Sequence, residues 1–140
     1  MIKRASCFRE LRIYVAACQM DLAVFIATKR FPKEEIYSLT DQVRRSSRSI
    51  GANLAEAWAK RRYPAHFVSK LTDADGELQE TRHWLGRALA YGYLDKPAFD
   101  VLETRGAAIG GMLGRMIREP ESFCAEADGG GGRRSDGWTG

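Results

Sequence analysis

Six basic side chains fall within one short segment, and their types and spacing suggest a chemistry. They are Arg44, Arg45, Arg48, Lys60, Arg61 and Arg62. Guanidinium groups bind phosphate oxygens in a fork geometry, and each neutralised phosphate adds salt-dependent affinity by releasing counterions. The cluster therefore favours phosphate contacts with RNA or another structured nucleic acid. A solvated charged face is the alternative, because Asp41 is spaced to pair with Arg44 and Arg45 along a helix.

A row of acidic residues with one tryptophan supplies the opposite charge. Asp73, Glu77, Glu80 and Trp84 recur at steps of three and four, which places them on one side of a helix. An exposed tryptophan beside carboxylates is typical of a contact surface. We therefore expect this row to meet the arginines of a neighbouring subunit. The alternative is an indole that lies over its own helix.

The remaining polar residues do not form an enzyme site. Asn53 and Glu56 suit a structural bridge to another helix better than catalysis, because an acid–base pair needs a second carboxyl group and a pocket. The two histidines and three cysteines lack metal-ligand spacing. The chain also lacks the Glu-x-x-His set of di-metal bundles, a glycine-rich phosphate loop, and a nucleophile with a histidine partner. We expect no catalytic activity, no metal and no cofactor.

Four helical segments must position these residues. Apolar residues at steps of three and four predict helices over about residues 6–30, 38–62, 64–91 and 97–118. Prolines lie between these segments and interrupt the helical pattern, because proline cannot continue a helix. The short connections imply an all-α, antiparallel up-down four-helix bundle over residues 1–125. Residues 126–140 are glycine-rich and poor in apolar side chains, so we expect a disordered tail there.

The same periodicity predicts which faces are buried. The expected stripes are Phe8, Leu11, Tyr14, Val15, Cys18, Leu22, Phe25 and Ile26 in the first helix, Leu39, Val43, Ser46, Ser47, Ile50, Leu54 and Trp58 in the second, Phe67, Leu71, Ala74, Leu78, Thr81, Leu85 and Leu89 in the third, and Phe99, Leu102, Ile109, Met112, Leu113 and Met116 in the fourth. Gly106, Gly110 and Gly114 predict close helix–helix approach within the bundle, with a subunit contact as the alternative.

Composition bounds the class of protein. The chain has 140 residues, of which 44% are apolar and 29% charged, typical of one soluble globular domain. The net charge of +4 is uneven, since residues 1–70 hold 14 Lys/Arg against 6 Asp/Glu and residues 71–140 hold 8 against 12. Surfaces of both signs are available for an anionic ligand or for another copy. Charges interrupt the apolar runs, so we expect no signal peptide, no membrane span and a cytoplasmic location.

An ordered series of short motifs resembles one known family. The motifs are Phe8-Arg9-Glu10-Leu11, Thr28-Lys29-Arg30-Phe31-Pro32, Glu35-Ile36-Tyr37-Ser38-Leu39-Thr40, Gln42-Val43-Arg44-Arg45, Ser49-Ile50, Asn53-Leu54-Ala55-Glu56, Glu77-Leu78-Gln79-Glu80-Thr81 and Gly92-Tyr93-Leu94. Together they resemble the bacterial four-helix-bundle proteins associated with 23S ribosomal RNA intervening sequences. The resemblance covers about residues 6–118.

This resemblance implies a bundle that assembles into a ring-like homopentamer with a basic surface for nucleic acid. Arg44 and Arg45 match the basic motif of the family, and Asn53 and Glu56 match its polar motif. The family is also similar to the accessory variability determinant of diversity-generating retroelements, which implies a reverse transcriptase as a candidate protein partner. The chain departs from the family at Ala57, which replaces a frequent glycine and should extend the second helix towards Arg62.

Two functional hypotheses follow. The first is a non-enzymatic, oligomeric protein that binds RNA or another structured nucleic acid through the basic face of residues 38–62. The second is a self-assembling scaffold or adaptor that binds another protein and places its arginines at subunit contacts.

Overall fold

Four long helices dominate the computed structural model, which describes residues 5–124. They are α1 (Arg12–Thr28), α2 (Leu39–Ala59), α3 (Pro64–Ala90) and α4 (Lys96–Arg118). Three short 3-10 helices flank them: η1 (Phe8–Glu10), η2 (Lys33–Glu35) and η3 (Pro120–Ser122). Residues 5–124 contain no strand, so the predicted all-α fold with four helices is confirmed. The tail predicted at 126–140 lies outside the described residues.

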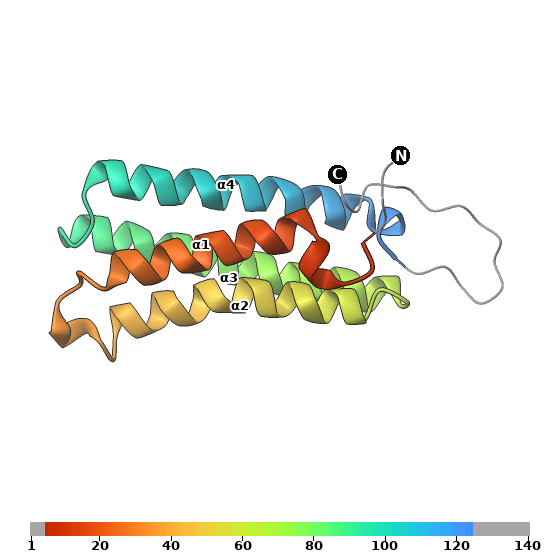
Figure 1. Ribbon diagram of the computed structural model, residues 1–140, viewed down its shortest axis with the longest axis horizontal. Helices are drawn as coiled ribbons and strands as arrows, with labels where there is room; N and C mark the ends of the chain where they lie inside the picture. Colours follow the sequence, from red (N-terminus) through yellow and green to blue (C-terminus); the bar gives the residue numbers. More distant parts are fainter. Residues whose placement is uncertain (1–4, 125–140) are drawn as a thin grey trace.

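The four helices lie side by side along the long axis of the molecule (Figure 1). Helix α1 packs against α2, α2 against α3, α3 against α4, and α4 against α1. Short loops reverse the chain between successive helices, so neighbours in sequence run in opposite directions (Figure 1). Each helix therefore has two neighbours, one face towards the core and one face outward.

Two helix boundaries differ from the predicted ones. Helix α1 begins at Arg12 rather than near residue 6, because Leu11 has extended backbone angles (φ −68°, ψ 130°) and separates it from η1. Helix α2 ends at Ala59. Pro64 occupies the first turn of α3 and Tyr63 before it is extended (φ −117°, ψ 96°), so residues 60–63 form a turn. The expected extension of the second helix to Arg62 is wrong.

The core matches the predicted stripes in three of the four helices. All seven residues of the α2 stripe are buried, as are Phe67, Leu71, Ala74, Leu78, Thr81 and Leu85 of α3 and Leu102, Ile109, Leu113 and Met116 of α4. One polar pair lies inside this apolar core. The hydroxyl oxygens of Ser46 on α2 and Thr81 on α3 are 2.8 Å apart, and both residues are fully buried. A buried hydroxyl with a partner avoids the cost of desolvation without a hydrogen bond.

The predicted buried face of α1 is wrong over most of the helix. The residues that face the core are Ile13, Ala17, Met20, Val24 and Thr28. Val15, Cys18, Leu22 and Ile26, which were expected inside, are exposed. Helix α1 is apolar around most of its circumference, so it carries two apolar stripes at helical spacing and periodicity alone does not distinguish them.

The glycines of α4 are not required by close backbone packing. A Cβ atom added at Gly106 or Gly110 would meet its nearest neighbours at 3.5 to 3.6 Å, which is ordinary van der Waals contact. At Gly114 the nearest atom, at 3.1 Å, belongs to the flexible end of Arg118. Both glycines therefore face side chains of neighbouring helices within the bundle, as predicted, although a methyl group would fit at either position.

Candidate nucleic-acid and subunit-contact surfaces

Two of the three basic residues of α2, Arg44 and Arg45, are held by contacts within the protein. Arg44 is half-buried, and its Nε donates a hydrogen bond of 2.7 Å to Thr28 Oγ1 at the end of α1. Its guanidinium carbon also lies 4.9 Å from the centre of the Phe25 ring, within range of a cation–π interaction. Arg44 thus fastens α2 to α1, and only part of its side chain is accessible to a ligand.

Arg45 is paired with the acidic row of α3 in the same chain. Its guanidinium group lies 3.4 Å from Glu77 Oε2 and forms a second ion pair with Glu80. About half of the Arg45 side chain remains exposed (47%). The pair that was expected between neighbouring subunits is therefore available inside one protomer.

Arg48, the third basic residue of α2, lies on the surface. It is exposed, and its positive charge acts on Asp21 of α1. Burial raises the pKa of Asp21, and the charge of Arg48 opposes that rise. Arg48 forms no ion pair at contact distance within the described residues. It can therefore meet an external anion without first breaking a salt bridge.

The other three basic residues lie at the opposite end of α2. Lys60, Arg61 and Arg62 fall in the turn after the helix, at a rise of roughly 20 Å along the axis from Arg45 and Arg48. Arg61 is folded back, with its guanidinium 3.9 Å from the Trp58 ring centre and a hydrogen bond of 2.9 Å to the Trp58 carbonyl. Lys60 and Arg62 are exposed. The six residues form two separate groups rather than one patch.

The polar pair of α2 divides into two roles. Glu56 accepts a contact of 2.8 Å from Lys70 Nζ and so joins α2 to α3. The hydrogen bond from Lys70 and its positive charge lower the pKa of Glu56. Asn53 instead donates its side-chain amide to the Ser49 carbonyl at 2.9 Å, within its own helix. Only Glu56 makes the bridge between helices that was expected of both residues.

The acidic row of α3 is largely engaged by its own protomer. Glu77 and Glu80 pair with Arg45, and Asp73 lies 3.6 Å from Lys70. Trp84 is half-buried, and its indole N–H donates to Glu80 at 3.3 Å. The indole thus lies against its own helix, the second of the two arrangements considered from the sequence. Asp73 keeps the most accessible carboxylate of the row, with 55% of its side chain exposed.

An outward apolar stripe on α1 is a surface that the sequence interpretation missed. Val15, Leu22 and Ile26 are 44%, 58% and 56% exposed, and Cys18 lies beside them. Val101 of the neighbouring helix α4 adds another exposed apolar side chain (58%). The signal was present in the sequence as a second apolar period, because Ile13, Ala17, Met20 and Val24 fill the inner face. Helix α1 is therefore apolar on its outer face as well as on the face that packs in the core.

The described residues hold no metal cluster and no membrane span. No group of three or more His, Cys, Asp or Glu residues in this part of the chain is arranged to bind a metal ion. None of the helices within residues 5–124 has the length and apolar character needed to cross a bilayer.

The fold and these surfaces define a four-helix protein in which ion pairs join α2 to α3 and α3 to α4, and the outer face of α1 is apolar. Residues 9–115 match the family model described as "23S rRNA-intervening sequence protein". The chain belongs to this family, as its motifs predicted. No curated protein sequence matches the chain.

The fold is similar to that of a protein whose structure has been solved. The solved structure is a crystal structure of a protein of unknown function from the S23 ribosomal protein family of Bacteroides thetaiotaomicron. The two chains are 23% identical, the TM-score is 0.68, and the match covers 76% of this chain and 98% of the other. This similarity supports the helical fold of the chain.

Proposed function

We propose that this protein is a self-assembling scaffold in which the outer face of α1 packs against a second copy. The observation that supports the proposal is the exposed stripe of Val15, Leu22 and Ile26. Exposed apolar surface on one side of a small domain marks a contact site, because its burial removes apolar area from water. The stripe spans roughly 16 Å of helix between its first and last residues.

The distribution of charged residues supports another copy of this chain as the partner. The outer side of α1 is bounded by Arg12 and Arg30, whereas α3 carries the acidic row with its exposed Asp73. Helix α1 does not pack against α3 within the protomer. A neighbouring copy can bring an acidic α3 near these arginines, and opposite charges favour that orientation.

A contact between two different surfaces of the same protein generates a ring when its rotation closes. We propose a closed ring of five subunits, the number implied by the resemblance to the family. The acidic residues of α3 then lie at the subunit boundary, with Asp73 rather than Glu77 or Glu80 as the accessible carboxylate.

Nucleic-acid binding is the second activity that we propose, for the assembled ring. Arg48 and Lys60 support it, because both are exposed and neither forms an ion pair at contact distance within residues 5–124. A single protomer offers few such cations, but a ring repeats them in every subunit. Each additional phosphate contact makes the binding affinity depend more steeply on salt concentration. Arg44 and Arg45 contribute less than the sequence indicated because Thr28, Glu77 and Glu80 hold them.

One experiment tests both parts on the same sample. The mass of the wild-type protein is measured by light scattering, and binding to a labelled structured RNA is measured across a salt series. We expect an assembly of about five 15.7 kDa chains. Replacing Leu22 and Ile26 together by Gln should give protomers, whereas Tyr37→Gln, at a residue that is 93% exposed away from the stripe, should leave the assembly intact.

The RNA measurement separates the two activities. Arg48→Gln with Lys60→Gln should leave the mass unchanged and flatten the salt dependence of binding. Lys33→Gln with Arg105→Gln, two exposed cations elsewhere, serves as the matched loss of two charges. A wild-type protein that remains a protomer at all concentrations would contradict the scaffold. An intact ring without RNA binding at low salt would contradict the second activity and leave the scaffold standing.

A further inference from the structure

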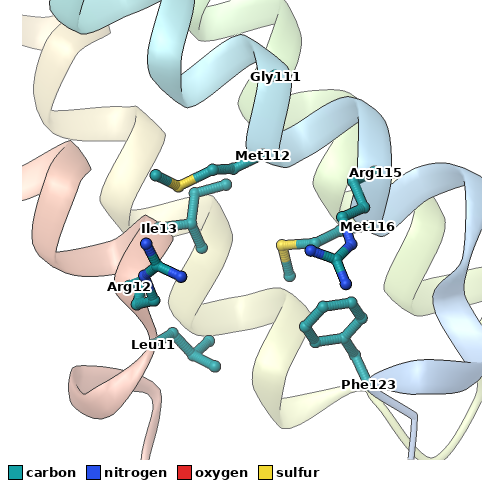
Figure 2. A pocket seen from close by; sticks show the side chains of 8 residues that line it. All are labelled: Leu11, Arg12, Ile13, Gly111, Met112, Arg115, Met116 and Phe123. Atoms are coloured by element: carbon teal, nitrogen blue, oxygen red, sulfur yellow. The ribbon is translucent and has the colours of Figure 1, made fainter. Parts of the chain in front are cut away.

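A cavity of about 310 Å³ lies at the end of the bundle where α1 begins and α4 ends (Figure 2). Its apolar lining comes from three parts of the chain: Leu11 and Ile13 at the start of α1, Met112 and Met116 on α4, and Phe123 after η3. Leu11, Met116 and Phe123 are buried. The volume lies at the lower end of the range of small-molecule sites.

The charged residues of the lining are both positive. Arg12 and Arg115 line the cavity, and no carboxylate does. Figure 2 shows the Arg12 guanidinium beside Ile13 and that of Arg115 beside Met116 and Phe123. Arg115 has one loose ion pair, at 3.6 Å, with Glu119, and both side chains are more than half exposed. This pair is of the weak, solvent-screened kind, so it does not prevent Arg115 from meeting another anion.

The backbone at the start of α1 has the same preference for negative charge. Leu11 occupies the N-cap position without a side-chain acceptor, and the first turn contains no acidic residue. The amide groups of a helix's first turn point along its axis without partners in the helix, and the helix dipole favours an anion there. Because Leu11, Arg12 and Ile13 line the cavity, the start of α1 adds its positive potential to that of the two guanidinium groups.

We propose that this cavity binds a medium-chain aliphatic carboxylate, with its chain on the apolar lining and its carboxylate between Arg12 and Arg115. The lining offers methionine, leucine and phenylalanine side chains and no neutral hydrogen-bonding side chain, which suits a hydrocarbon chain better than a sugar or a base. One water occupies about 30 Å³, so the space corresponds to roughly ten heavy atoms. Octanoate is of that size.

The first measurement is a titration of the purified full chain with octanoate. Calorimetry measures the binding, and the NMR shifts of the methionine methyl groups locate it. We expect saturable binding of one octanoate per protomer, with the largest shifts at Met112 and Met116. Octanol has the same chain without the charge, and acetate has the charge without the chain. Each should bind at least about tenfold more weakly, because a charge-assisted hydrogen bond or the chain contact is lost.

Matched substitutions test the position of the site. Gly111 lines the cavity, and a Cβ atom added there meets nothing within 4 Å, so the backbone has room for the first side-chain atom of Gly111→Leu beside the space that the ligand would fill. This substitution should abolish binding. Gly76→Leu, at a helical glycine of α3 that is equally open, should not. Arg115→Gln should weaken binding about tenfold, whereas Arg105→Gln on the same helix, outside the cavity, should have no effect.

Three results would overturn the proposal. One is equal affinity for octanoate and octanol, which would mean that the arginines do not take part. Another is unchanged binding in Gly111→Leu, which would place the ligand elsewhere. The third is no saturable binding to the full chain. None of these results bears on the proposed assembly, which is measured as mass.

Discussion

The two sides of this bundle hold together by different means. On one side, polar contacts join α2 to α3 both in the core and at the surface. The buried contact is that of Ser46 with Thr81, and the surface contacts are Arg45 with Glu77 and Glu80, and Glu56 with Lys70. On the side of α1 and α4, no ion pair crosses the boundary within the described residues, and the outer surface carries Leu22, Ile26 and Val101.

The difference bears on which side we propose as the contact surface. Contacts that are directional and charge-matched fix the register of α2 against α3 and leave few unpaired groups for a partner. Apolar packing fixes only the contact area, so the α1 and α4 side can accept a second surface on its outer face. The side with the candidate nucleic-acid residues is thus held mainly by contacts within the protomer. The side without an ion pair across its helix boundary is the one on which we propose that a partner packs.

The largest effect that would sharpen this comparison is the loss of the buried hydroxyl pair. Thr81→Val keeps the shape of the side chain but removes the hydroxyl that contacts Ser46, which keeps only its hydrogen bond of 3.3 Å to the Val43 carbonyl. We therefore expect a loss of about 1–1.5 kcal/mol in the free energy of unfolding. Urea denaturation at fixed protein concentration measures it.

Thr72→Val is the control for that substitution. Thr72 lies on the exposed side of the same helix and donates to the carbonyl of Val68, as Thr81 does to that of Glu77, but has no partner across the helix boundary. The control should change stability by no more than about 0.5 kcal/mol. Equal losses in both variants would mean that the contact between Ser46 and Thr81 adds nothing, and the comparison between the two sides would fail.

A smaller effect of the opposite sign is expected on the side of α4. Gly110→Ala places its Cβ atom at 3.6 Å from a methyl group of Leu78, a normal contact, and removes the helix penalty of glycine. The variant should be more stable by about 0.5–1 kcal/mol in urea denaturation. Gly92→Ala should be destabilised, because Gly92 has φ +81° at the end of α3. A destabilised Gly110→Ala would show that the helices pack more closely than the structure indicates.

The sequence predicted the helices well because apolar spacing is a local signal. Val43, Ile50, Leu78 and Ile109 each lie on a single apolar stripe and are fully buried. The face of α1 could not be predicted in the same way, because both of its sides are apolar and only the neighbouring helices decide which one is inside. The second apolar stripe was visible in the sequence, and it would have identified Leu22 and Ile26 as candidates for an exposed apolar surface.

The candidate site was harder to predict than the fold. The type and spacing of Arg44 and Arg45 are local, but their partners Thr28, Glu77 and Glu80 are 16 to 35 residues away in sequence. Whether a guanidinium group is free for phosphate depends on those distant carboxylates and hydroxyls. The proposed carboxylate cavity depends even more on tertiary structure, since its lining combines the two ends of the described chain.

The smallest expected effect concerns the loops that join the two sides at one end of the bundle. Tyr93, between α3 and α4, donates its hydroxyl to Glu35, between α1 and α2, at 2.9 Å. Hydrogen bonds from Ser38 and Tyr93 lower the pKa of Glu35 below its ordinary value of 4.5. Because the pKa is lowered in the folded protein, these bonds stabilise the fold above that pH, and their contribution disappears as the pH falls through the folded pKa.

Tyr93→Phe should raise the pKa of Glu35 towards its ordinary value and weaken the acid dependence of stability, and the carboxyl-carbon shift of Glu35 followed by NMR during acid titration measures it. Tyr91→Phe is the control, because the Tyr91 ring lies near Tyr93 but the Glu35 hydrogen bond comes from Tyr93. If the Glu35 titration is the same in both variants, the two loops are not joined through this bond. The two sides of the bundle would then be linked at this end by apolar packing, such as Phe31 against the Tyr93 ring at 5.6 Å.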